Sequence, residues 1–477
     1  MFKLVAMKKI FIIICLSIIS AFSIAQSDYS GIWQGAIENG KSKILIVFRI
    51  SEEESKLKAS IDIPEQMVLD YKNIKANVKD DSLIINLAAF KASYKAIRIN
   101  DSLEGIWYQS GMELPLNMEL TPEDKAFSVK RPQTPEPPFP YICKEVTFYN
   151  KKAKIKLAGT LTIPDTTKQW PVVVLVSGSG PQDRNEEIAK HKPFLVIADY
   201  FTRNGIAVLR YDDRGVGKSE GVFGNATTID FGNDAEAAVS FLAKLPYIDK
   251  NSIGIVGHSE GGIIALMQAS KNKSLRFVIS MAGVSIPCLQ LLVMQNDKIM
   301  EGMGVEEDVR DFFWNYYTAF YNLLLVEKSS DSLKNKAIRL FDESIKVLSD
   351  EQQTEYHLNH NFVTSLLMEA SSPWFKYFIS IIPSNYISKI KINVLAINGA
   401  KDVQVPAEAN IEAFNTYINP QRGIYKESHI FPGLNHLFQP CNTGMTSEYA
   451  MIETTIDPHV LYYMTEWIKK VTSVPKK

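Results

Sequence analysis

The sequence feature that most constrains the fold is the pentapeptide Gly-His-Ser-Glu-Gly at residues 257–261, which lies between two apolar runs. The run before it (252–256) reads as a short strand, and the run after it (262–267) reads as the start of a helix. A strand, a sharp turn and a helix form a nucleophile elbow when the turn is G-x-S-x-G. Glycines tolerate the strained turn, and a helix N-terminus favours developing negative charge. We therefore expect Ser259 to be a nucleophile; the alternative is a glycine-rich turn of any doubly wound domain.

A nucleophile elbow predicts an acidic residue and then a histidine, each on a loop that follows a later strand. Residues 392–397 read as a buried parallel strand, and Asp402 lies on the loop after it. The strand at 429–431 breaks at a Pro-Gly pair and is followed by His436. The sequence therefore predicts a triad of Ser259, Asp402 and His436, in which the histidine is the general base.

The other six histidines are weaker candidates. His258 precedes Ser259 in the elbow and is less well placed than the serine. His357 and His360 have i,i+3 spacing on an expected helix, but no third metal ligand is near, so a solvated helix face is favoured. We expect neither a metal nor a cofactor. The remaining histidines have no catalytic context or lie on a predicted strand: His191, His429 and His459.

A third loop follows the β-branched run at 171–176, which is typical of a central parallel strand. It reads Ser-Gly-Ser-Gly-Pro-Gln-Asp-Arg over residues 177–184. This position is where one oxyanion-hole N–H is expected, and the other comes from the residue after the nucleophile, Glu260. The Asp and Arg residues of a further loop at 212–219 are better read as a structural ion pair than as a second acid/base pair.

Together these loops resemble the α/β-hydrolase superfamily, and more narrowly its serine aminopeptidase-like branch, which includes two-domain bacterial carboxylesterases. The similarity covers roughly residues 145–475. It implies a mostly parallel sheet with helices on both faces, and it implies the same triad. Many relatives carry His-Gly before the small oxyanion residue, whereas this chain has Ser177-Gly178. We place the oxyanion donor of this loop at Ser179.

The length of 477 residues suggests two domains, and the strand pattern changes along the chain. Residues 26–120 carry short, partly alternating strands, which predict a small all-β barrel-like or sandwich domain. Gly-Ile-Trp occurs there at 31–33 and again at 105–107, and the two tryptophans either line a pocket or close the core. Repeated prolines identify residues 121–140 as a stiff linker.

The hydrolase domain is expected over residues 141–477, with a helical cap at about 286–388 inserted before the Asp402 strand. This insertion is helical without a convincing parallel strand. Its aromatic and methionine side chains either form an acyl pocket or pack the cap itself: Met300, Met303, Phe312, Phe313, Trp314, Tyr316 and Tyr317.

The N-terminus has the pattern of a secretory signal peptide over residues 1–25. Two lysines precede an apolar core at 10–19, and a small-x-small cleavage site ends at Ala25. The apolar core is too short for a stable membrane span. A lipoprotein signal at Cys15 is the less favoured alternative because a bulky isoleucine precedes that cysteine. We expect an exported protein, either periplasmic or extracellular.

The composition limits the classes of partner that this protein is expected to bind. A hydrophobic fraction of 46% and a formal net charge of -1 are typical of an ordinary globular protein and predict no nucleic-acid partner. Three cysteines remain after the signal, Cys143, Cys288 and Cys441, so at most one disulfide can form.

We therefore expect an exported serine hydrolase that cleaves carboxylic esters, with short acyl chains, through an acyl-enzyme. A serine amino- or oligopeptidase with the same triad is the alternative. A non-catalytic surface binding protein is a third reading, from a different class. The expected partner is a small ester substrate; the partner of the β-domain stays open.

Overall fold

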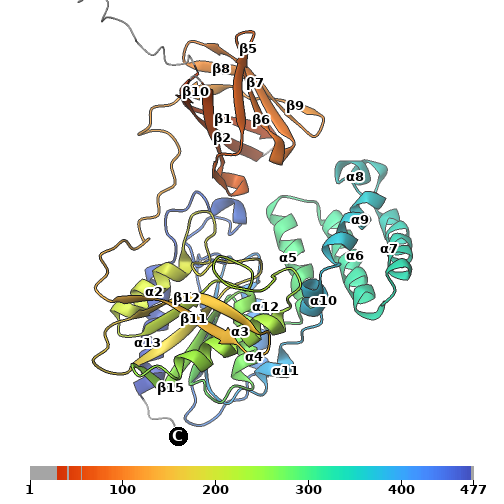
Figure 1. Cartoon of the computed structure of the whole chain (residues 1–477). Helices are drawn as coiled ribbons and strands as arrows, with labels where there is room; N and C mark the ends of the chain where they lie inside the picture. The colour runs from red at the N-terminus through yellow and green to blue at the C-terminus, as the bar shows by residue number, and fades with distance from the viewer. Residues whose placement is uncertain (1–28, 40–41, 55, 474–477) are drawn as a thin grey trace, which may run out of the picture. The chain divides into compact units, whose positions relative to one another are not determined.

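The computed structural model describes residues 29–39, 42–54 and 56–473 (Figure 1). The chain divides into two compact units, one reaching to Val129 and including Tyr449–Met451, the other holding Lys130–Glu448 and Ile452 onward. The predicted signal peptide lies outside the described residues. No helix in the described ranges is long and apolar enough to cross a membrane.

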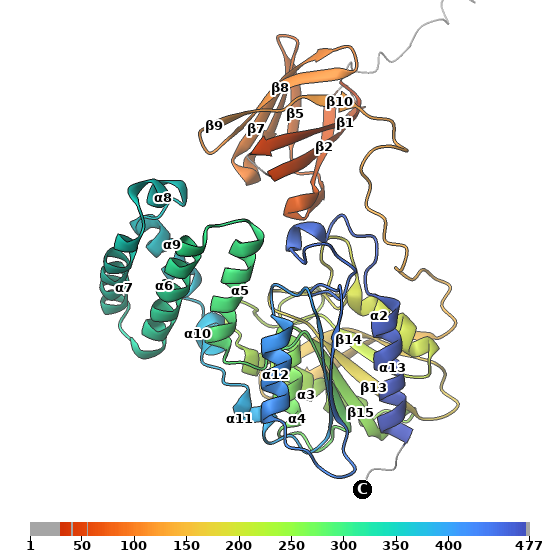
Figure 2. The ribbon, with the colours of Figure 1, turned by 180° about the vertical axis from the view of Figure 1, so that it is seen from behind.

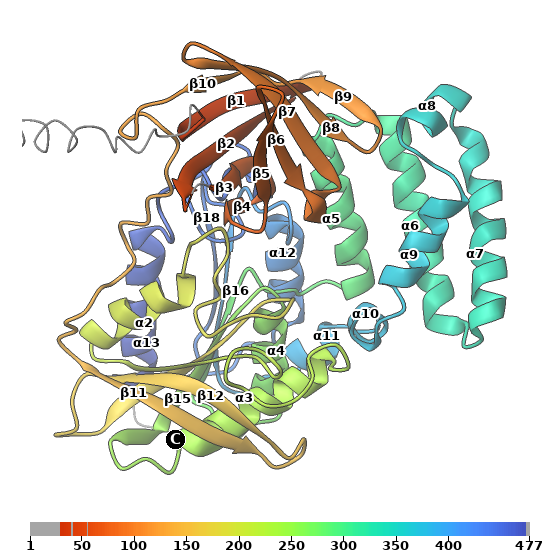
Figure 3. The ribbon, with the colours of Figure 1, turned by 45° about the horizontal axis from the view of Figure 1, so that its top comes forward.

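The first unit is one strongly curled antiparallel sheet, whose strands can be followed in Figure 3. Its strand order is β4-β3-β2-β1-β10-β8-β7-β6-β5, with β9 paired to β8. Strand β3 also packs against β5, so the two ends of the sheet approach each other like a barrel. The strands are β1 (Gly31–Asn39), β2 (Ser42–Glu53), β3 (Lys56–Ile63), β4 (Val68–Tyr71), β5 (Lys75–Lys79), β6 (Ser82–Leu87), β7 (Ala92–Ile99), β8 (Ser102–Gln109), β9 (Met112–Pro115) and β10 (Met118–Leu120).

The two tryptophans of the repeated Gly-Ile-Trp motif lie in the core of this first unit. Trp33 and Trp107 are both almost fully buried and belong to the same apolar cluster. Their indole N–H groups are satisfied internally, by the carbonyl of Tyr29 at 2.8 Å and by Gln109 Oε1 at 3.1 Å. The core-closing role is therefore confirmed.

The second unit contains an eight-stranded sheet of order β11-β12-β14-β13-β15-β16-β17-β18. The first pairings, β11 with β12 and β12 with β14, are antiparallel, and every later pairing is parallel. This is the expected sheet of an α/β-hydrolase. The strands are β11 (Ile142–Asn150), β12 (Ile155–Ile163), β13 (Trp170–Val176), β14 (Ala207–Tyr211), β15 (Ile248–His258), β16 (Phe277–Met281), β17 (Asn393–Gly399) and β18 (Lys426–Phe431).

Both faces of this sheet are buried, because alternate residues of the central strands point to opposite sides. In β13, Val172, Val174 and Val176 belong to one apolar cluster, which also holds side chains of α3 (Thr228–Leu242), α4 (Glu260–Ala269) and α12 (Ala407–Tyr417). Val173 and Leu175 belong to the other cluster, with α2 (Pro193–Arg203) and α13 (Pro458–Ser473). The predicted three-layer arrangement is therefore confirmed.

The proline-rich stretch from residue 130 is bound to this second unit. Arg131 donates hydrogen bonds to the carbonyls of Ala189 and Ile452, at 2.7 and 3.0 Å. The side-chain amide of Gln133 donates to the carbonyl of Ile456 at 2.8 Å and accepts the N–H of Ile456 at 3.0 Å. The beginning of this stretch, at Arg131 and Gln133, is therefore held by hydrogen bonds to the backbone of the hydrolase unit.

The insertion between β16 and β17 is helical, as expected, and has its own core (Figure 2). Its helices are α5 (Cys288–Gly302), α6 (Glu307–Val326), α7 (Ser330–Ser344), α8 (Asp350–Glu355), α9 (His360–Glu369), α10 (Pro373–Ile379) and α11 (Ser384–Ile387). Helices α6 to α9 lie beside the sheet in Figures 1 and 2, and α5 and α10 connect them to it.

In the cap, the structure decides one alternative that the sequence left open and corrects one prediction. None of the seven aromatic and methionine residues named above lines the candidate site; Phe312, Phe313 and Tyr316 pack the cap core, and Met303 and Trp314 are exposed. His357 and His360 do not share a helix, because α8 ends at Glu355 and α9 begins at His360. A helical apolar period identifies a buried face but does not identify what covers that face.

Candidate active site

The predicted elbow forms at the end of β15. Ser259 has φ of 54° and ψ of -117°, a conformation that residues with a side chain rarely adopt. A Cβ on Gly257 would lie 1.9 Å from the carbonyl oxygen of Gly261, and a Cβ on Gly261 would lie 2.0 Å from that of Val176. Only glycine fits at these two positions. The tight turn therefore presents Ser259 at the N-terminus of α4.

The acid and the histidine meet at the same edge of the sheet. Asp402 follows β17 and His436 follows β18, and the carboxyl ends of neighbouring parallel strands lie together. His436 Nδ1 lies 2.7 Å from Asp402 Oδ2, and both side chains are buried. The other carboxylate oxygen accepts the N–H groups of Gln404 and Val405, each at 2.8 Å. This pairing directs Nδ1–H toward the carboxylate and leaves Nε2 on the opposite side of the ring.

The loop that carries His436 is fixed by its neighbours. Asn435 Oδ1 accepts hydrogen bonds from the N–H groups of Leu437 and Gln439, at 3.0 and 2.9 Å. The N–H of Lys401, beside the acid, donates to the carbonyl of Leu434 at 2.9 Å. The acid loop and the histidine loop are therefore joined through their backbones.

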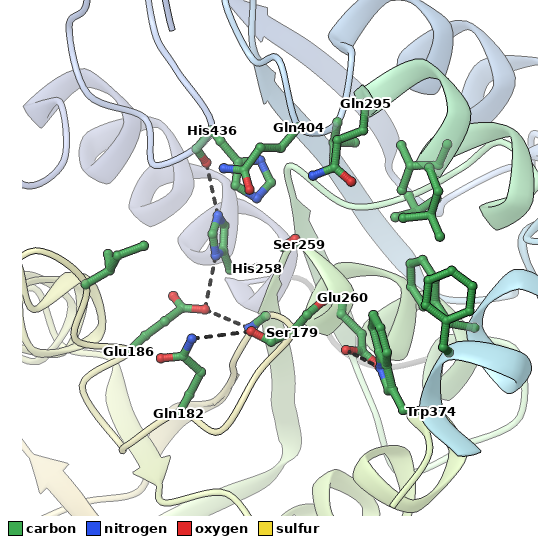
Figure 4. A pocket seen from close by; sticks show the side chains of 18 of the residues that line it. Ser179, Gln182, Glu186, His258, Ser259, Glu260, Gln295, Trp374, Gln404 and His436 are labelled. Carbon is green, nitrogen blue, oxygen red and sulfur yellow. Dashed lines mark hydrogen bonds and ion pairs between the residues drawn. The ribbon is translucent and has the colours of Figure 1, made fainter. Parts of the chain in front are cut away.

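Ser259 and His436 line one cavity with a volume of about 510 Å³ (Figure 4). Its apolar wall comes from the elbow side of the sheet and from cap helices α5 and α10: Val284, Leu291, Leu292, Trp374, Phe375 and Phe378. Three carboxylates also line it, Glu186, Glu260 and Glu369, and none of its described lining residues is a lysine or arginine. The cavity thus combines an apolar wall with two buried carboxylates, those of Glu186 and Glu260, and the exposed carboxylate of Glu369.

The two expected oxyanion donors border this cavity as well. Ser179 and Glu260 both line it, and within the described residues no protein acceptor takes either backbone N–H. The N–H of Gly178, by contrast, donates to Glu186 Oε1 at 2.7 Å. Gly178 and Ser179 lie in the loop between β13 and α2, which we call the oxyanion loop. Of their two N–H groups, that of Ser179 is therefore the one left for a ligand.

A buried carboxylate lies directly after the predicted nucleophile. Both oxygens of Glu260 accept the indole N–H of Trp374, at 2.9 and 3.0 Å, which connects the elbow to cap helix α10. Burial raises the pKa of Glu260, and interactions with Trp374 and Ser179 offset part of that rise. Residues of the cap and of the oxyanion loop thus surround this side chain.

Asp213 is a second buried acid of this region. Its carboxylate accepts the Ser177 hydroxyl at 2.9 Å and the Gln182 N–H at 3.0 Å. Burial, together with the smaller effect of the nearby charges of Glu186 and Glu260, raises the pKa of Asp213 to about 7 against these hydrogen bonds. Asp213 therefore helps to fix the conformation of the oxyanion loop through Ser177 and Gln182.

The other charged residues of this region form ion pairs, as predicted. Arg184 pairs with Asp212 at 2.7 Å, and Arg214 pairs with Asp234 at 2.7 Å. All four side chains are largely buried. They hold the loops after β13 and β14 and do not line the cavity.

Sequence reasoning missed three residues of the site: Glu186, His258 and Trp374. Glu186 contacts His258 across 72 residues of chain, and Trp374 contacts Glu260 across 114. No local spacing signals pairs this distant. A histidine inside the elbow was the one available hint, and its neighbour Ser259 was the stronger candidate.

No group of three or more potential metal ligands occurs in the part of the chain that the structure describes. Cys143, Cys288 and Cys441 are unpaired with one another, and Cys288 is buried.

Comparison with known proteins agrees with this architecture. The sequence model of the X-Pro dipeptidyl-peptidase (S15 family) matches residues 153–433, more than half of the chain. Esterase EstD of Thermotoga maritima is 26% identical over 316 residues, which are 66% of this chain and 66% of EstD. An uncharacterized 31.7 kDa protein of Escherichia coli is 21% identical over 325 residues, covering 66% of this chain and 96% of that protein.

One solved structure with a similar chain course is that of the α/β-hydrolase GrgF of Penicillium sp. sh18. It aligns over 70% of this chain and 100% of its own, with 16% identity and a TM-score of 0.43. The S15 match is the more informative, since it runs from β12 to β18 and includes both the elbow and the acid loop. The chain therefore belongs to the X-Pro dipeptidyl-peptidase (S15) family, within the esterase-like α/β-hydrolases.

Proposed function

We propose that this protein is an exported serine hydrolase that cleaves small carboxylic esters, with Ser259, His436 and Asp402 as its catalytic triad. One observation carries the proposal: a serine on a strained elbow and a histidine paired with a buried carboxylate line the same cavity. Triads are recognised by this geometry and by the roles it permits, whatever the fold around them.

In this mechanism Ser259 Oγ attacks the ester carbonyl carbon while His436 Nε2 accepts its proton. The carbonyl oxygen becomes an oxyanion that receives hydrogen bonds from the N–H groups of Ser179 and Glu260. The imidazolium of His436, stabilised by Asp402, then protonates the leaving alkoxide, and an alcohol departs. Water attacks the acyl-enzyme with His436 again as base, which releases the carboxylic acid and restores the serine.

The cavity supports a small substrate. Its volume of about 510 Å³ lies in the range of small-molecule sites, and cap residues close its apolar wall. None of the described lining residues is a lysine or arginine that could pair with an anionic acyl group, so neutral acyl esters are favoured over dicarboxylic half-esters. Export rests on the signal-peptide pattern of residues 1–25.

The test uses the purified full chain and a fluorophosphonate probe. We expect covalent labelling of the wild type, and Ser259→Ala should lose the label and lower kcat for p-nitrophenyl acetate at least about 10³-fold. Ser270→Ala is the matched control, because that serine lies at the far end of the same helix, where its hydroxyl donates to the Met267 carbonyl at 2.7 Å. Full esterase activity in Ser259→Ala would refute the assignment.

A peptidase of the same triad is the second candidate, favoured by the S15 family match and by the three carboxylates of the cavity. Carboxylates are suitable partners for the ammonium group of a peptide N-terminus. A comparison of kcat/KM for p-nitrophenyl acetate with that for glycyl-proline p-nitroanilide separates the two candidates. A larger value for the anilide would make the protein a peptidase.

A further inference from the structure

Glu186 occupies an unusual position in the oxyanion loop. It is 4% exposed and has φ of 53°, in the left-handed region that residues other than glycine rarely adopt. Its Oε1 atom accepts the N–H of Gly178 at 2.7 Å and lies 3.0 Å from His258 Nδ1 (Figure 4). A strained backbone that persists at a candidate site calls for a functional explanation.

His258 continues this chain of contacts to the catalytic histidine. Its Nε2 lies 3.0 Å from the backbone carbonyl oxygen of His436, and the two ring centres are 4.7 Å apart. A carbonyl oxygen only accepts hydrogen bonds, so Nε2 carries a proton. Glu186 Oε1 is placed to accept from Nδ1–H in the same way, so a doubly protonated His258 ring donates to both neighbours.

The charge environment is consistent with that state. Burial by itself lowers the pKa of His258, but the charge and hydrogen bond of Glu186, the carbonyl of His436 and the charge of Asp402 outweigh it, so the pKa is raised. Asp213 faces Glu186 from the next loop. Within the described residues, Glu186 and His258 thus form a buried ion pair between two loops of the site.

We propose that Glu186 and His258 act as one positioning unit, which holds the oxyanion loop through the Gly178 N–H and the catalytic loop through the His436 carbonyl. The proposal rests on the function proposed above, because it assigns the unit to the placement of Ser179 and His436. Neither residue has a chemical step of its own.

An ordinary structural ion pair is the competing explanation, and two features argue against it. Buried ion pairs contribute little net stability, since desolvation of the charges offsets their attraction. This pair also bonds two backbone groups, the Gly178 N–H and the His436 carbonyl. Gly178 adjoins Ser179, and the proposed reaction depends on the positions of Ser179 and His436. A displacement of about 1 Å at such positions can lower a rate about 100-fold.

The experiment is a double-mutant cycle in the full chain with Glu186→Gln, His258→Asn and the double variant. Each single variant should lower kcat for p-nitrophenyl acetate roughly 10- to 100-fold while KM stays within about twofold, because placement affects the transition state more than ground-state binding. If the two residues act together, the double variant should be no slower than the slower single variant. Rates are normalised to the folded fraction from thermal melts.

Glu187→Gln is the matched control, since this neighbouring carboxylate is part-exposed and pairs only loosely with Lys192, at 3.7 Å. It should retain wild-type kcat. Three results would overturn the inference: unchanged kcat in both single variants, losses that multiply in the double variant, or losses accounted for by the folded fraction or by KM alone. Failure of the proposed function is recognised separately, because the wild type would then not react with the fluorophosphonate.

Discussion

The buried carboxyl group of Asp213 makes the stability of the hydrolase unit fall as the pH rises. Its pKa is about 7 in the folded protein and has an ordinary value of 3.8, so the native state holds the proton more tightly than the unfolded state. Stability from this group is therefore greatest below about pH 4 and falls as pH rises to about 7. The difference corresponds to about 4 kcal/mol at most, reached above pH 7.

Asp213→Asn removes this loss, because an amide does not ionise. The amide oxygen can accept the Gln182 N–H, and the amide NH₂ can donate to the Ser177 hydroxyl, so both contacts have a replacement. Imperfect geometry costs about 1 kcal/mol. The wild type has lost about 1.7 kcal/mol of this stability at pH 5 and about 4 kcal/mol at pH 8, so we expect the variant to exceed it by less than about 1 kcal/mol at pH 5 and by about 3 kcal/mol at pH 8.

Urea unfolding at pH 5, 6, 7 and 8 measures this, followed by the helical circular dichroism signal. The described α-helices all belong to the second unit, so the signal reports that unit. Asp249→Asn is the control: its carboxylate also accepts one backbone N–H and one serine hydroxyl, but it is only part-buried. A stability difference for Asp213→Asn that does not change between pH 5 and pH 8 would refute the reasoning.

Three further predictions concern the site. Asp402→Asn should lower kcat on the order of 10⁴-fold by favouring the wrong imidazole tautomer, while Glu408→Gln on the following helix should change it less than about threefold; equal effects in steady-state assays would contradict the triad. Trp374→Phe removes the donor of the buried glutamate after the nucleophile and should cost about 1–3 kcal/mol in urea unfolding, and an unchanged midpoint would show that the bond is unimportant. Residues 130–477 alone should hydrolyse p-nitrophenyl acetate and butyrate with higher kcat/KM than long-chain esters, and an optimum at long chains would contradict the closed pocket.

Much of this architecture could be predicted because its causes are local. The elbow needs glycine at 257 and 261, since a Cβ there meets a backbone carbonyl within about 2 Å. This requirement can be recognised from the five residues 257–261 alone. The order of Ser259, Asp402 and His436 is likewise a property of the chain, and parallel strands bring the loops that follow them to one edge of the sheet.

The packing of the cap helices could not be predicted from the sequence. Its helices were predicted from apolar periodicity, which left open whether their aromatic residues form an acyl pocket or pack the cap; Phe312, Phe313 and Tyr316 pack the cap core. The wall of the cavity comes from α5 and α10, through side chains such as Leu291 and Trp374. Periodicity indicates that a helix face is buried, but the partner of that face depends on how the helices pack.

The sequence by itself therefore determined the fold class, the elbow and the residues predicted as the triad, because each depends on local sterics or on chain order. Only the tertiary structure decided which N–H of the oxyanion loop is free and which cap residues reach the cavity. It also decided that Glu186 meets His258. The contacts of Glu186 with His258 and of Trp374 with Glu260 join segments 72 and 114 residues apart. Such pairings arise from packing and leave no spacing pattern in the chain.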